Sequence, residues 1–407
     1  MLLALAWRNI WRRPQRTVLS LMSIAIVTAL LVFMLSFQLG VYGTMKEATL
    51  RMVDGFAQIQ PAGYADDPAL DRTIAHPESL VRQAVAIDGV ATAAPRVNAF
   101  AILANGDRSY GAMVIGVAPA SEAKVSSLAS MVREGRYLKA SDDDAAVVGA
   151  LLARNLGVSV GNKVTLLGSA RDGSVAADAL RVVGIYRSGV PELDRAILEM
   201  PLARAQDTFG MTDRANTIAL GGPSLASVDG ALPALDRLGR RHGVSVLDWT
   251  KLEPALSDAI SLKVATSMLF YVTLVAVVSF IILNTLLMSV LERTREFGIL
   301  LALGMRPRLI GRMVWIELLG LALVGCVIGL AIGSAATLWF EQHGILYPAD
   351  MAKLMAQYGL PQRLYPTFTA LSASLGPGAI LTAIAVGGIV PYLRVARLTA
   401  ALAMRAA

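Results

Sequence analysis

The sequence predicts an α-helical membrane protein with four transmembrane helices and an extracytoplasmic α/β domain inserted between the first and the second. Three observations lead to this fold class. Hydrophobic residues make up 55% of the 407 residues, and the mean hydropathy is +0.57, which is typical of a membrane protein. Four stretches without charged residues are long enough to cross a bilayer, which takes about 20 residues. Most of the acidic residues lie in one long segment, 41–263.

The distribution of charge predicts the orientation of the chain. The segments 1–16, 292–312 and 394–407 together hold 12 Arg and 2 Glu, whereas 41–263 holds 23 Lys or Arg and 25 Asp or Glu. Because basic residues accumulate in short cytoplasmic loops, we expect both termini and 292–312 in the cytoplasm and 41–263 outside it. The net charge of +7 therefore reflects membrane topology and indicates no nucleic-acid partner.

These observations divide the chain into nine expected segments. They are an amphipathic interfacial helix at 1–16, transmembrane helix 1 at 17–40, the extracytoplasmic domain at 41–263, transmembrane helix 2 at 264–291, a cytoplasmic helix and loop at 292–312, transmembrane helix 3 at 313–340, an outer loop at 341–370, transmembrane helix 4 at 371–393, and a cytoplasmic basic tail at 394–407.

The first segment has the composition of a helix that lies on the membrane surface. Trp7 and Trp11 are four residues apart, as are Arg8 and Arg12, so aromatic and basic side chains would face the headgroup region. A cleaved signal peptide is the alternative. The apolar run that follows is longer than the 7–15 residues of a signal peptide, which argues against cleavage.

The outer segment carries mixed signals for strands and helices. Residues 97–117 predict a hairpin whose turn is Asn105 and Gly106. Further strands are expected at 142–148, 160–167, 180–186 and 244–247, and helices at 151–156 and 224–242. The one cysteine, Cys326, lies in the third span, so the outer domain holds no disulfide and must rely on its own core.

A short amphipathic helix is expected at 292–305, between the second and third spans. Apolar residues recur at helical spacing from Phe297, Gly304 would end the helix, and Pro307 blocks its continuation. Such a helix can lie along the membrane surface and meet a soluble partner. The nearby Glu317, one turn inside the third span, is expected to pair with Arg306, Arg308 or Arg312.

Three glycines fall on one stripe of the third span: Gly325, Gly329 and Gly333. Small residues at this spacing allow close approach of two helices in lipid. Because glycine is frequent in membrane helices, composition alone is the alternative explanation.

Three phrases of the sequence resemble one family. ERTREFGILLALG, EGRYLKASDDDAAVVGALLARNLGVSVGNKVTLLG and the closing IVPYLRVARLTAALAMRA look like the corresponding parts of FtsX/MacB/LolC-type ABC transporter permeases. LRVVGIYRSGVPELDRAILEMPLARAQDTFG is similar to the lipoprotein-releasing LolC/LolE branch. In the closing phrase, IVPYLRVARLTAALAMRA, Ala400 replaces the family's usual proline, but the basic residues remain. The resemblance implies a MacB-like periplasmic core domain at 41–263 and a multi-pass protein of the bacterial inner membrane.

The resemblance also implies a function and partners. Such permeases transmit the movement of a separate ATPase to their outer domain, and in the LolC/LolE branch this extracts a lipoprotein from the inner membrane. The expected partners are a LolD-like ATPase dimer, a second permease copy or a paralogue, lipoprotein cargo, a periplasmic chaperone, and membrane lipids. ATP and Mg would bind to the ATPase. No cofactor is expected on this chain, since the sequence has no G-x-x-x-x-G-K-S/T.

No enzymatic or metal motif emerges from the sequence. It has no H-E-x-x-H and no G-x-S-x-G, and His76, His242 and His343 are dispersed without metal-ligand spacing. The protein is therefore not expected to be an enzyme.

Two residue sets follow from the resemblance. The set expected to couple to the ATPase comprises Glu292, Arg293, Arg295, Glu296, Phe297, Gly298, Leu300, Leu301 and Gly304. The charged residues would meet the rim of the ATPase, Phe297, Leu300 and Leu301 would bury apolar area against it, and the glycines would leave room for close approach. The set expected to line a cargo cavity near the outer half of spans one and two comprises Phe33, Met34, Phe37, Met268, Tyr271 and Val275, for which ordinary helix or lipid packing is the alternative.

Two other functions stay open. One is MacB-like export of a small molecule or peptide, and the other is FtsX-like signalling to a cell-wall hydrolase. In the LolC branch a proline-containing hook recruits the chaperone. The matching link at 168–179 is short and has no proline, which argues against chaperone recruitment by this subunit. Neither the cargo nor the choice between homodimer and heterodimer follows from the sequence.

Overall fold

The computed structural model describes residues 14–357 and 363–397. The chain forms two compact units. The first, called here the membrane unit, consists of Met1–Gly43, Ile260–Leu346 and Arg363–Ala407, and the second, called here the domain, consists of Thr44–Ala259 and Tyr347–Gln362. The interfacial helix expected at 1–16 falls almost entirely outside the described residues, as does most of the basic tail.

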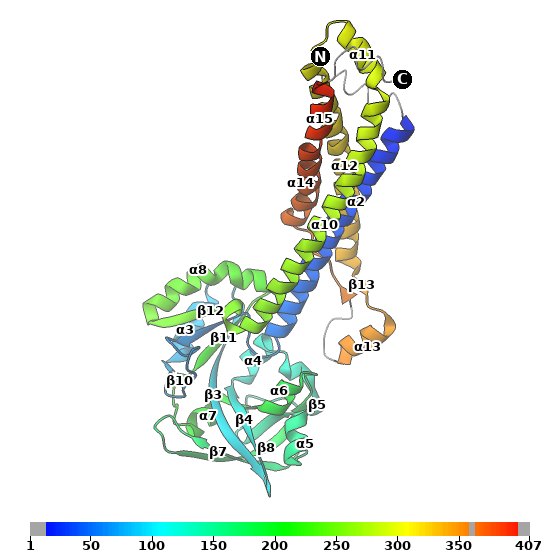
Figure 1. Cartoon of the computed structure of the whole chain (residues 1–407). Coiled ribbons are helices and arrows are strands. Elements are labelled where there is room, and N and C mark those ends of the chain that lie inside the picture. The colour runs from blue at the N-terminus through cyan, green and yellow to red at the C-terminus, as the bar shows by residue number, and fades with distance from the viewer. Residues whose placement is uncertain (1–13, 358–362, 398–407) are drawn as a thin grey trace. The chain divides into compact units, whose positions relative to one another are not determined.

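In the described part of the chain six helices form or enter the membrane unit (Figure 1): α2 (Pro14–Leu50), α10 (Pro254–Glu292), α11 (Thr294–Ala302), α12 (Pro307–His343), α14 (Ala370–Gly387) and α15 (Ile389–Ala396). Within the described residues, four segments are long and apolar enough to cross a membrane: Thr17–Leu50, Pro254–Asn284, Pro307–His343 and Ala370–Ala396. The prediction of four apolar helices with an α/β domain between the first and the second is confirmed.

The helices differ from the expected spans in length. The first helix continues past residue 40 to Leu50, and α10 begins at Pro254, ten residues before the expected span at 264. Charged residues mark where a helix leaves the lipid, but the helix itself continues as long as its backbone hydrogen bonds do. The charge-free stretches therefore underestimate the lengths of both helices. The last span is broken between α14 and α15 at Gly388.

The glycine stripe of α12 lies against α2. Gly325, Gly329 and Gly333 are all buried. A Cβ atom at Gly329 would lie 2.5 Å from the carbonyl oxygen of Ala25, and one at Gly325 would lie 2.7 Å from Ile24. Because these distances exclude any side chain, the two helices pack backbone to backbone along this stripe.

One ten-stranded sheet organises the domain, in the order β12-β1-β11-β3-β4-β9-β6-β8-β5, with β7 paired to β3 and β8. The strands are β1 (Ala57–Pro61), β3 (Thr92–Asn105), β4 (Arg108–Val117), β5 (Val132–Gly135), β6 (Ala145–Gly149), β7 (Lys163–Ser169), β8 (Val175–Tyr186), β9 (Ile197–Pro201), β11 (Thr217–Gly221) and β12 (Val244–Asp248). The pairs β4/β9 and β6/β8 are parallel, and the other pairs are antiparallel.

Two hairpins of this sheet refine the sequence prediction. Asn105 pairs with Arg108, so the turn between β3 and β4 is Gly106 and Asp107, one position later than predicted. Gly106 has a φ of 58°, a left-handed conformation that glycine adopts without strain. The predicted link at 168–179 is mostly strand, because β7 and β8 pair from Lys163–Arg181 to Ser169–Val175.

Helices with an apolar face pack against the sheet. These helices are α3 (Pro77–Val85), α4 (Pro119–Val125), α5 (Ala150–Leu156), α6 (Pro191–Ala196), α7 (Leu202–Thr208), α8 (Leu225–His242) and α9 (Trp249–Leu252). The domain also includes α13 (Ala349–Gln357). Short two-stranded pairs join β2 (Ile74–Ala75) to β10 (Arg214–Ala215) and β13 (Ile345–Leu346) to β14 (Arg363–Leu364). The helices α5 and α8 agree with those expected at 151–156 and 224–242.

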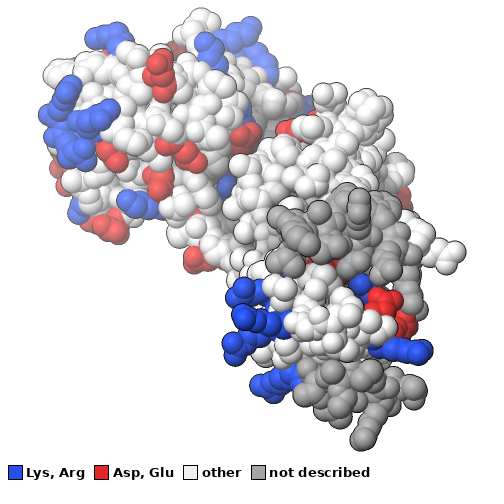
Figure 2. Space-filling view, turned by 90° about the horizontal axis from the view of Figure 1, so that it is seen from above, with Lys and Arg blue, Asp and Glu red and all other residues white. Residues whose placement is uncertain are grey.

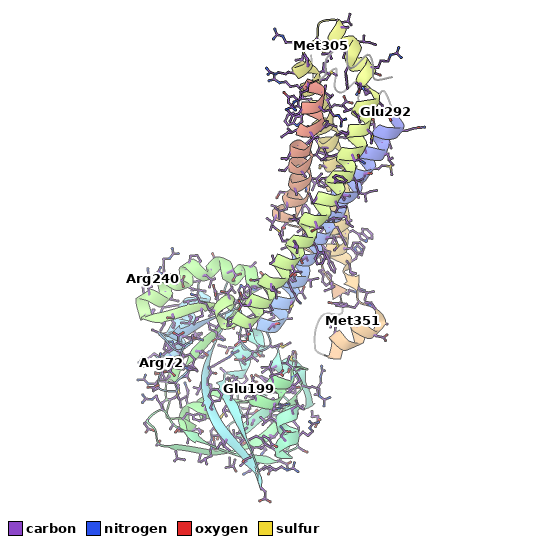
Figure 3. All side chains as sticks on the ribbon, in the orientation of Figure 1. Arg72, Glu199, Arg240, Glu292, Met305 and Met351 are labelled. Atoms are coloured by element: carbon purple, nitrogen blue, oxygen red, sulfur yellow. The ribbon has the colours of Figure 1, made fainter. Side chains whose placement is uncertain are left out.

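A charged cluster lies inside the domain. Arg96 of β3 donates two hydrogen bonds to Glu122 of α4, at 2.9 Å and 2.6 Å, and both side chains are at least 96% buried. Glu199 of β9, labelled in Figure 3, is also buried, and its Oε2 atom has no hydrogen-bond partner among the described residues. Burial, assisted by the Glu122 carboxylate, raises the pKa of Glu199 to about 8.

Candidate functional site

The short helix between the second and third spans is α11 (Thr294–Ala302). It is shorter than the expected 292–305, because Glu292 is the last residue of α10 and Arg293 separates the two helices. Gly304, with a φ of 92°, follows the helix, and the Met305 N–H bonds to the Leu300 carbonyl oxygen at 3.0 Å. This is the glycine-ended helix terminus that the sequence indicates.

The apolar face of α11 packs into the protein's own core. Phe297 is 1% exposed and belongs to the buried cluster of the membrane unit, and Leu300 and Leu301 pack against the same cluster. Gly298 is also buried. Phe297 is therefore covered by the protein's own spans, whereas Leu300 and Leu301 are only partly buried, and their expected contact with an ATPase stays a prediction. Because Gly298 is buried, a bulky residue there would disturb the packing of α11 against the spans and not its exposed face.

Arg293 holds the junction between α10 and α11 to the third span. Its guanidinium donates hydrogen bonds to both carboxylate oxygens of Glu317, at 3.1 Å and 3.2 Å, and lies 3.4 Å from Glu296. It also stands 5.5 Å from the centre of the Phe297 ring. The expected pairing of Glu317 with Arg306, Arg308 or Arg312 is thus corrected: the partner comes from the start of α11, which ties that helix to α12.

The outer face of α11 carries residues that the sequence reasoning missed. Ile299 is 53% exposed and Leu303 is 80% exposed, and they share this face with the exposed Arg295 and Glu296. In helical projection Arg295, Ile299 and Ala302 follow one line, opposite the Phe297–Leu301 side. The signal was available in the sequence, since two apolar stripes on one nine-residue helix predict contacts on both sides.

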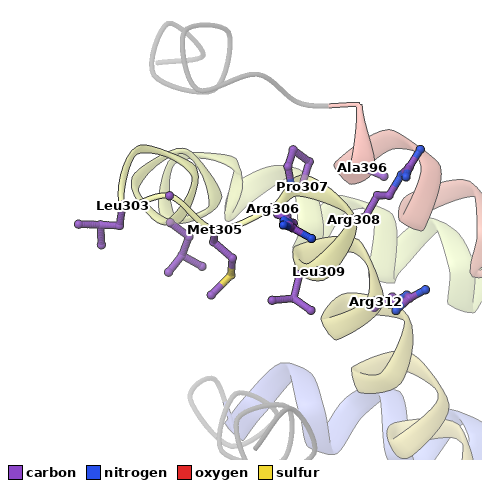
Figure 4. A pocket seen from close by; sticks show the side chains of 10 residues that line it. Leu303, Met305, Arg306, Pro307, Arg308, Leu309, Arg312 and Ala396 are labelled. Atoms are coloured by element: carbon purple, nitrogen blue, oxygen red, sulfur yellow. The ribbon is translucent and has the colours of Figure 1, made fainter.

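An open cavity of about 1070 Å³ lies beside this helix (Figure 4). It lies between the end of α11, the start of α12 and Ala396. Its charged lining consists of Arg306, Arg308 and Arg312. Figure 2 shows Lys and Arg side chains gathered in groups on the surface of the molecule, beside mostly uncharged surface.

The six residues expected to line a cargo cavity have different environments. Met34 and Met268 are exposed on α2 and α10, at 42% and 54%. Phe33 packs edge-on against Phe340 of α12, with ring centres 5.8 Å apart, and stacks on Phe37. Tyr271 donates a hydrogen bond of 2.6 Å to Gln38 of α2, and Val275 packs against the membrane-unit core. Tyr271 thus joins α2 to α10, while the two methionines are open to an apolar ligand.

Potential metal ligands do not gather in the described part of the chain. Within residues 14–357 and 363–397, no group of three or more His, Cys, Asp or Glu residues could hold a metal ion.

Two family models match the chain. Residues 268–400 match the FtsX-like permease C-terminal model, and residues 17–238, more than half of the chain, match the MacB-like periplasmic core domain. The chain is 27% identical over 302 residues to the lipoprotein-releasing system transmembrane protein LolC of Neisseria meningitidis serogroup B, covering 72% of this chain and 69% of that protein. It is 28% identical over 330 residues to the corresponding LolE of Haemophilus influenzae, covering 77% and 75%.

A solved structure is also similar to part of the chain. The periplasmic region of MacB from Actinobacillus actinomycetemcomitans aligns with 49% of this chain and 91% of that one, at 15% identity and a TM-score of 0.36. Together with the four apolar helices, the two family matches account for the membrane unit and the domain. The chain belongs to the FtsX/MacB-type family of ABC transporter permeases, multi-pass membrane proteins with a periplasmic domain that work with an ATPase.

Proposed function

We propose that this permease releases lipoproteins from the inner membrane, driven by a separate ATPase. The observation that carries the proposal is the similarity to LolC and LolE, which extends over about three quarters of this chain and includes both the domain and the spans. A match confined to the spans would support only a generic permease. In this proposal both termini and α11 are cytoplasmic, as the charge distribution favours.

The ATPase contact is assigned to the outer face of α11. Ile299 and Leu303 offer exposed apolar area, and Arg295 and Glu296 flank it with charges that set orientation. The partner is a LolD-like ATPase dimer that binds ATP and Mg. Movement of α11 would reach the third span through Arg293 and Glu317.

The cargo is assigned to the apolar surface at Met34 and Met268. Both side chains are exposed, and flexible methionines adapt to acyl chains of varied shape. Most of the apolar surface of α10 is likewise uncovered, with 11% of its most apolar window buried. That surface can accept a second permease copy or a paralogue.

Coupling is tested with Ile299→Asp in the full-length permease co-expressed with its ATPase. A carboxylate at the centre of the apolar contact should abolish co-purification of the ATPase, because it would be desolvated without a partner. The matched control is Val85→Asp, which places the same charge at a residue of α3 that is 39% exposed in the domain. If Ile299→Asp retains the ATPase as the control does, α11 does not dock through this face.

Cargo is tested with photo-crosslinking residues at Met34 and Met268. With ATPase present, both positions should capture a lipidated protein in native membranes. Capture of phospholipid alone would reject lipoprotein release and leave export or signalling to a hydrolase as the work of the permease. Residue Leu323 of α12, 55% exposed, serves as the control for contact with bulk lipid.

A further inference from the structure

A cavity of about 670 Å³ lies over an apolar patch of the domain's sheet. Its floor includes Phe100 and Ile102 of β3 and Leu167 of β7, which are 68%, 51% and 49% exposed. Ala101, between the first two, is buried in the core, so β3 turns alternate side chains to the core and to the cavity. Leu167 pairs with Ile102 across the two strands. The sheet therefore presents a contiguous apolar surface to the cavity.

The floor is hollow at a glycine of β4. Gly111 pairs with Ile102, and a Cβ atom at Gly111 would lie more than 4 Å from every described atom outside its chain neighbours. At Gly168 of β7, by contrast, a Cβ atom would lie 3.2 Å from the Phe100 carbonyl oxygen. The space above Gly111 is therefore open to a ligand. The volume of the cavity falls within the range of about 300–1,000 Å³ that is typical of small-molecule sites.

The wall of the cavity is acidic. Asp54, Glu192 and Glu253 line it, and none of its described lining residues is Lys, Arg or His. Asp54 follows α2 in the chain, Glu253 directly precedes α10, and Glu192 belongs to α6. Because carboxylate oxygens accept hydrogen bonds and carry negative charge, this wall is complementary to a cationic donor.

Two of these carboxyl groups form a pair. The side chains of Asp54 and Glu253 hydrogen-bond to each other, which requires that one of them holds a proton. Burial, assisted by the Asp54 carboxylate, raises the pKa of Glu253 to about 7. Burial also raises the pKa of Asp54, although the Arg96 guanidinium opposes this shift. Near neutral pH the pair thus shares a proton, and an ammonium group can take its place.

The floor and the wall together select one class of ligand. An inorganic cation would leave the apolar floor uncovered, and a neutral apolar molecule would leave the acidic wall without a partner. A primary or secondary amine with an apolar body satisfies both. Its N–H groups donate to the carboxylates, and its hydrocarbon part covers Phe100, Ile102 and Leu167.

We propose that this cavity binds a small amphipathic amine, with the ammonium group at Asp54 and Glu253 and the apolar body on the floor formed by β3 and β7. All of these residues belong to the domain. The inference goes beyond the proposed function, because it requires neither a lipoprotein nor an ATPase.

The test is equilibrium binding of dansylcadaverine to the full-length permease in nanodiscs, with empty nanodiscs as the blank for partitioning into lipid. This probe carries a primary ammonium on an apolar fluorophore, and its N-acetyl derivative is neutral. The wild type should bind the amine about 10-fold more tightly than the derivative. Gly111→Leu should abolish binding, because its side chain fills the cavity. Gly230→Leu, at an exposed position of α8 where a Cβ atom also meets open space, is the matched control.

The acidic wall is tested by Glu253→Gln. This variant should bind the amine about 10-fold more weakly and the neutral derivative as the wild type does. Glu134→Gln, at an exposed position of β5 outside the cavity, should change neither affinity. In the wild type, affinity for the amine should fall about 10-fold from pH 8 to pH 6, because protonation of the pair competes with the ammonium group. Glu253→Gln should lose this dependence.

Four outcomes would overturn the proposal. They are the absence of saturable amine binding by the wild type, equal affinity for the two probes, amine binding by Gly111→Leu equal to wild type, and amine binding by Glu253→Gln equal to wild type. The second would identify a purely apolar pocket, and the third would place binding elsewhere. Where Gly111→Leu does not fold, the comparison of the two probes in the wild type and in Glu253→Gln decides.

Discussion

The domain and the membrane unit each contain an arginine flanked by two glutamates, and the two clusters are built differently. In the domain Arg96 meets Glu122 at 2.6 Å and 2.9 Å, and the side chains are 4% and 1% exposed. In the membrane unit Arg293 meets Glu317 at 3.1 Å and 3.2 Å, and the side chains are 13% and 18% exposed. The hydrogen bonds of the second cluster are longer, its side chains are more exposed to solvent, and it adjoins α11, which has an exposed face.

The second glutamate of each cluster is likewise more buried in the domain than in the membrane unit. Glu199 in the domain is buried, with its pKa raised to about 8, so it holds a proton at neutral pH. Glu296 in the membrane unit is 51% exposed at 3.4 Å from Arg293. The domain cluster fixes one packing of sheet and helix. In the membrane unit Glu296 competes with Glu317 for Arg293 from an exposed position, so this contact can exchange more easily than the buried one.

The largest expected effect comes from Glu122→Gln. It leaves the Arg96 charge buried without its ionic partner, which typically costs about 3–5 kcal/mol of stability. Thermal unfolding of the full-length protein should show early melting of the domain and increased sensitivity to protease. Combining Arg96→Met with Glu122→Leu removes both charges and should recover most of the loss. A Glu122→Gln protein as stable as wild type would mean that the pair is not structural.

Arg293→Gln should have a smaller effect on stability and a large effect on transport. The lost charged hydrogen bonds at a partly exposed site are worth about 1–3 kcal/mol. The protein should insert and bind the ATPase, but ATP-driven cargo release in liposomes should fail. Arg394→Gln, at an exposed position of α15, is the control for charge alone. Transport by Arg293→Gln at the wild-type rate would show that the junction transmits nothing.

Glu199→Gln should alter the dependence of stability on pH. The folded pKa of about 8 lies above the ordinary 4.5, so the folded state holds a proton that the unfolded chain releases between these values. Wild-type stability is therefore complete below about pH 4.5 and falls as the pH rises toward 8, by up to ~1.4 kcal/mol per pH unit. Glutamine stays neutral, so melting curves of the variant from pH 5 to 9 should lack this decline. An identical decline in both proteins would show that Glu199 is not its source.

Glu296→Gln should change stability least. The Arg293–Glu296 contact is 3.4 Å long and half exposed on the Glu296 side, so its removal is worth about 0.2–1 kcal/mol. The difference should shrink further in high salt, where exposed pairs are screened. A loss comparable to that of Glu122→Gln would contradict the division between a fixed and a changeable cluster.

The sequence predicted the architecture well, because spans and their order follow from composition and charge. It left open which neighbour covers the apolar stripe of α11, and in the structure the spans cover Phe297. Phe297, Leu300 and Leu301 form a conspicuous apolar stripe, but periodicity states that a face is apolar and not which neighbour covers it. The pairing of Arg293 with Glu317 spans 24 positions in the chain and depends on where α10 ends, which periodicity leaves uncertain by several residues.

In the domain the predicted elements were those with local signals. The β3–β4 hairpin and α8 carry a turn motif and a long amphipathic pattern. Strands such as β1 and β11 were missed, because they are short and buried on both faces and so lack alternation. The Arg96–Glu122 cluster was missed for a different reason: nothing local distinguishes a buried pair from two solvated charges.

The tip of the β7–β8 hairpin has a consequence for how this domain can diverge. The strands pair up to Ser169 and Val175, and the Ala170 N–H bonds to the Ser174 carbonyl oxygen at 2.8 Å, so the ladder is closed before the turn begins. An insertion between Asp172 and Gly173 would leave every ladder bond in place and pay only the slowly growing entropy of a longer loop. New recognition sequences can therefore be acquired or grafted at this point without redesigning the sheet, and descendants of one scaffold can come to differ in their soluble partners by a few residues.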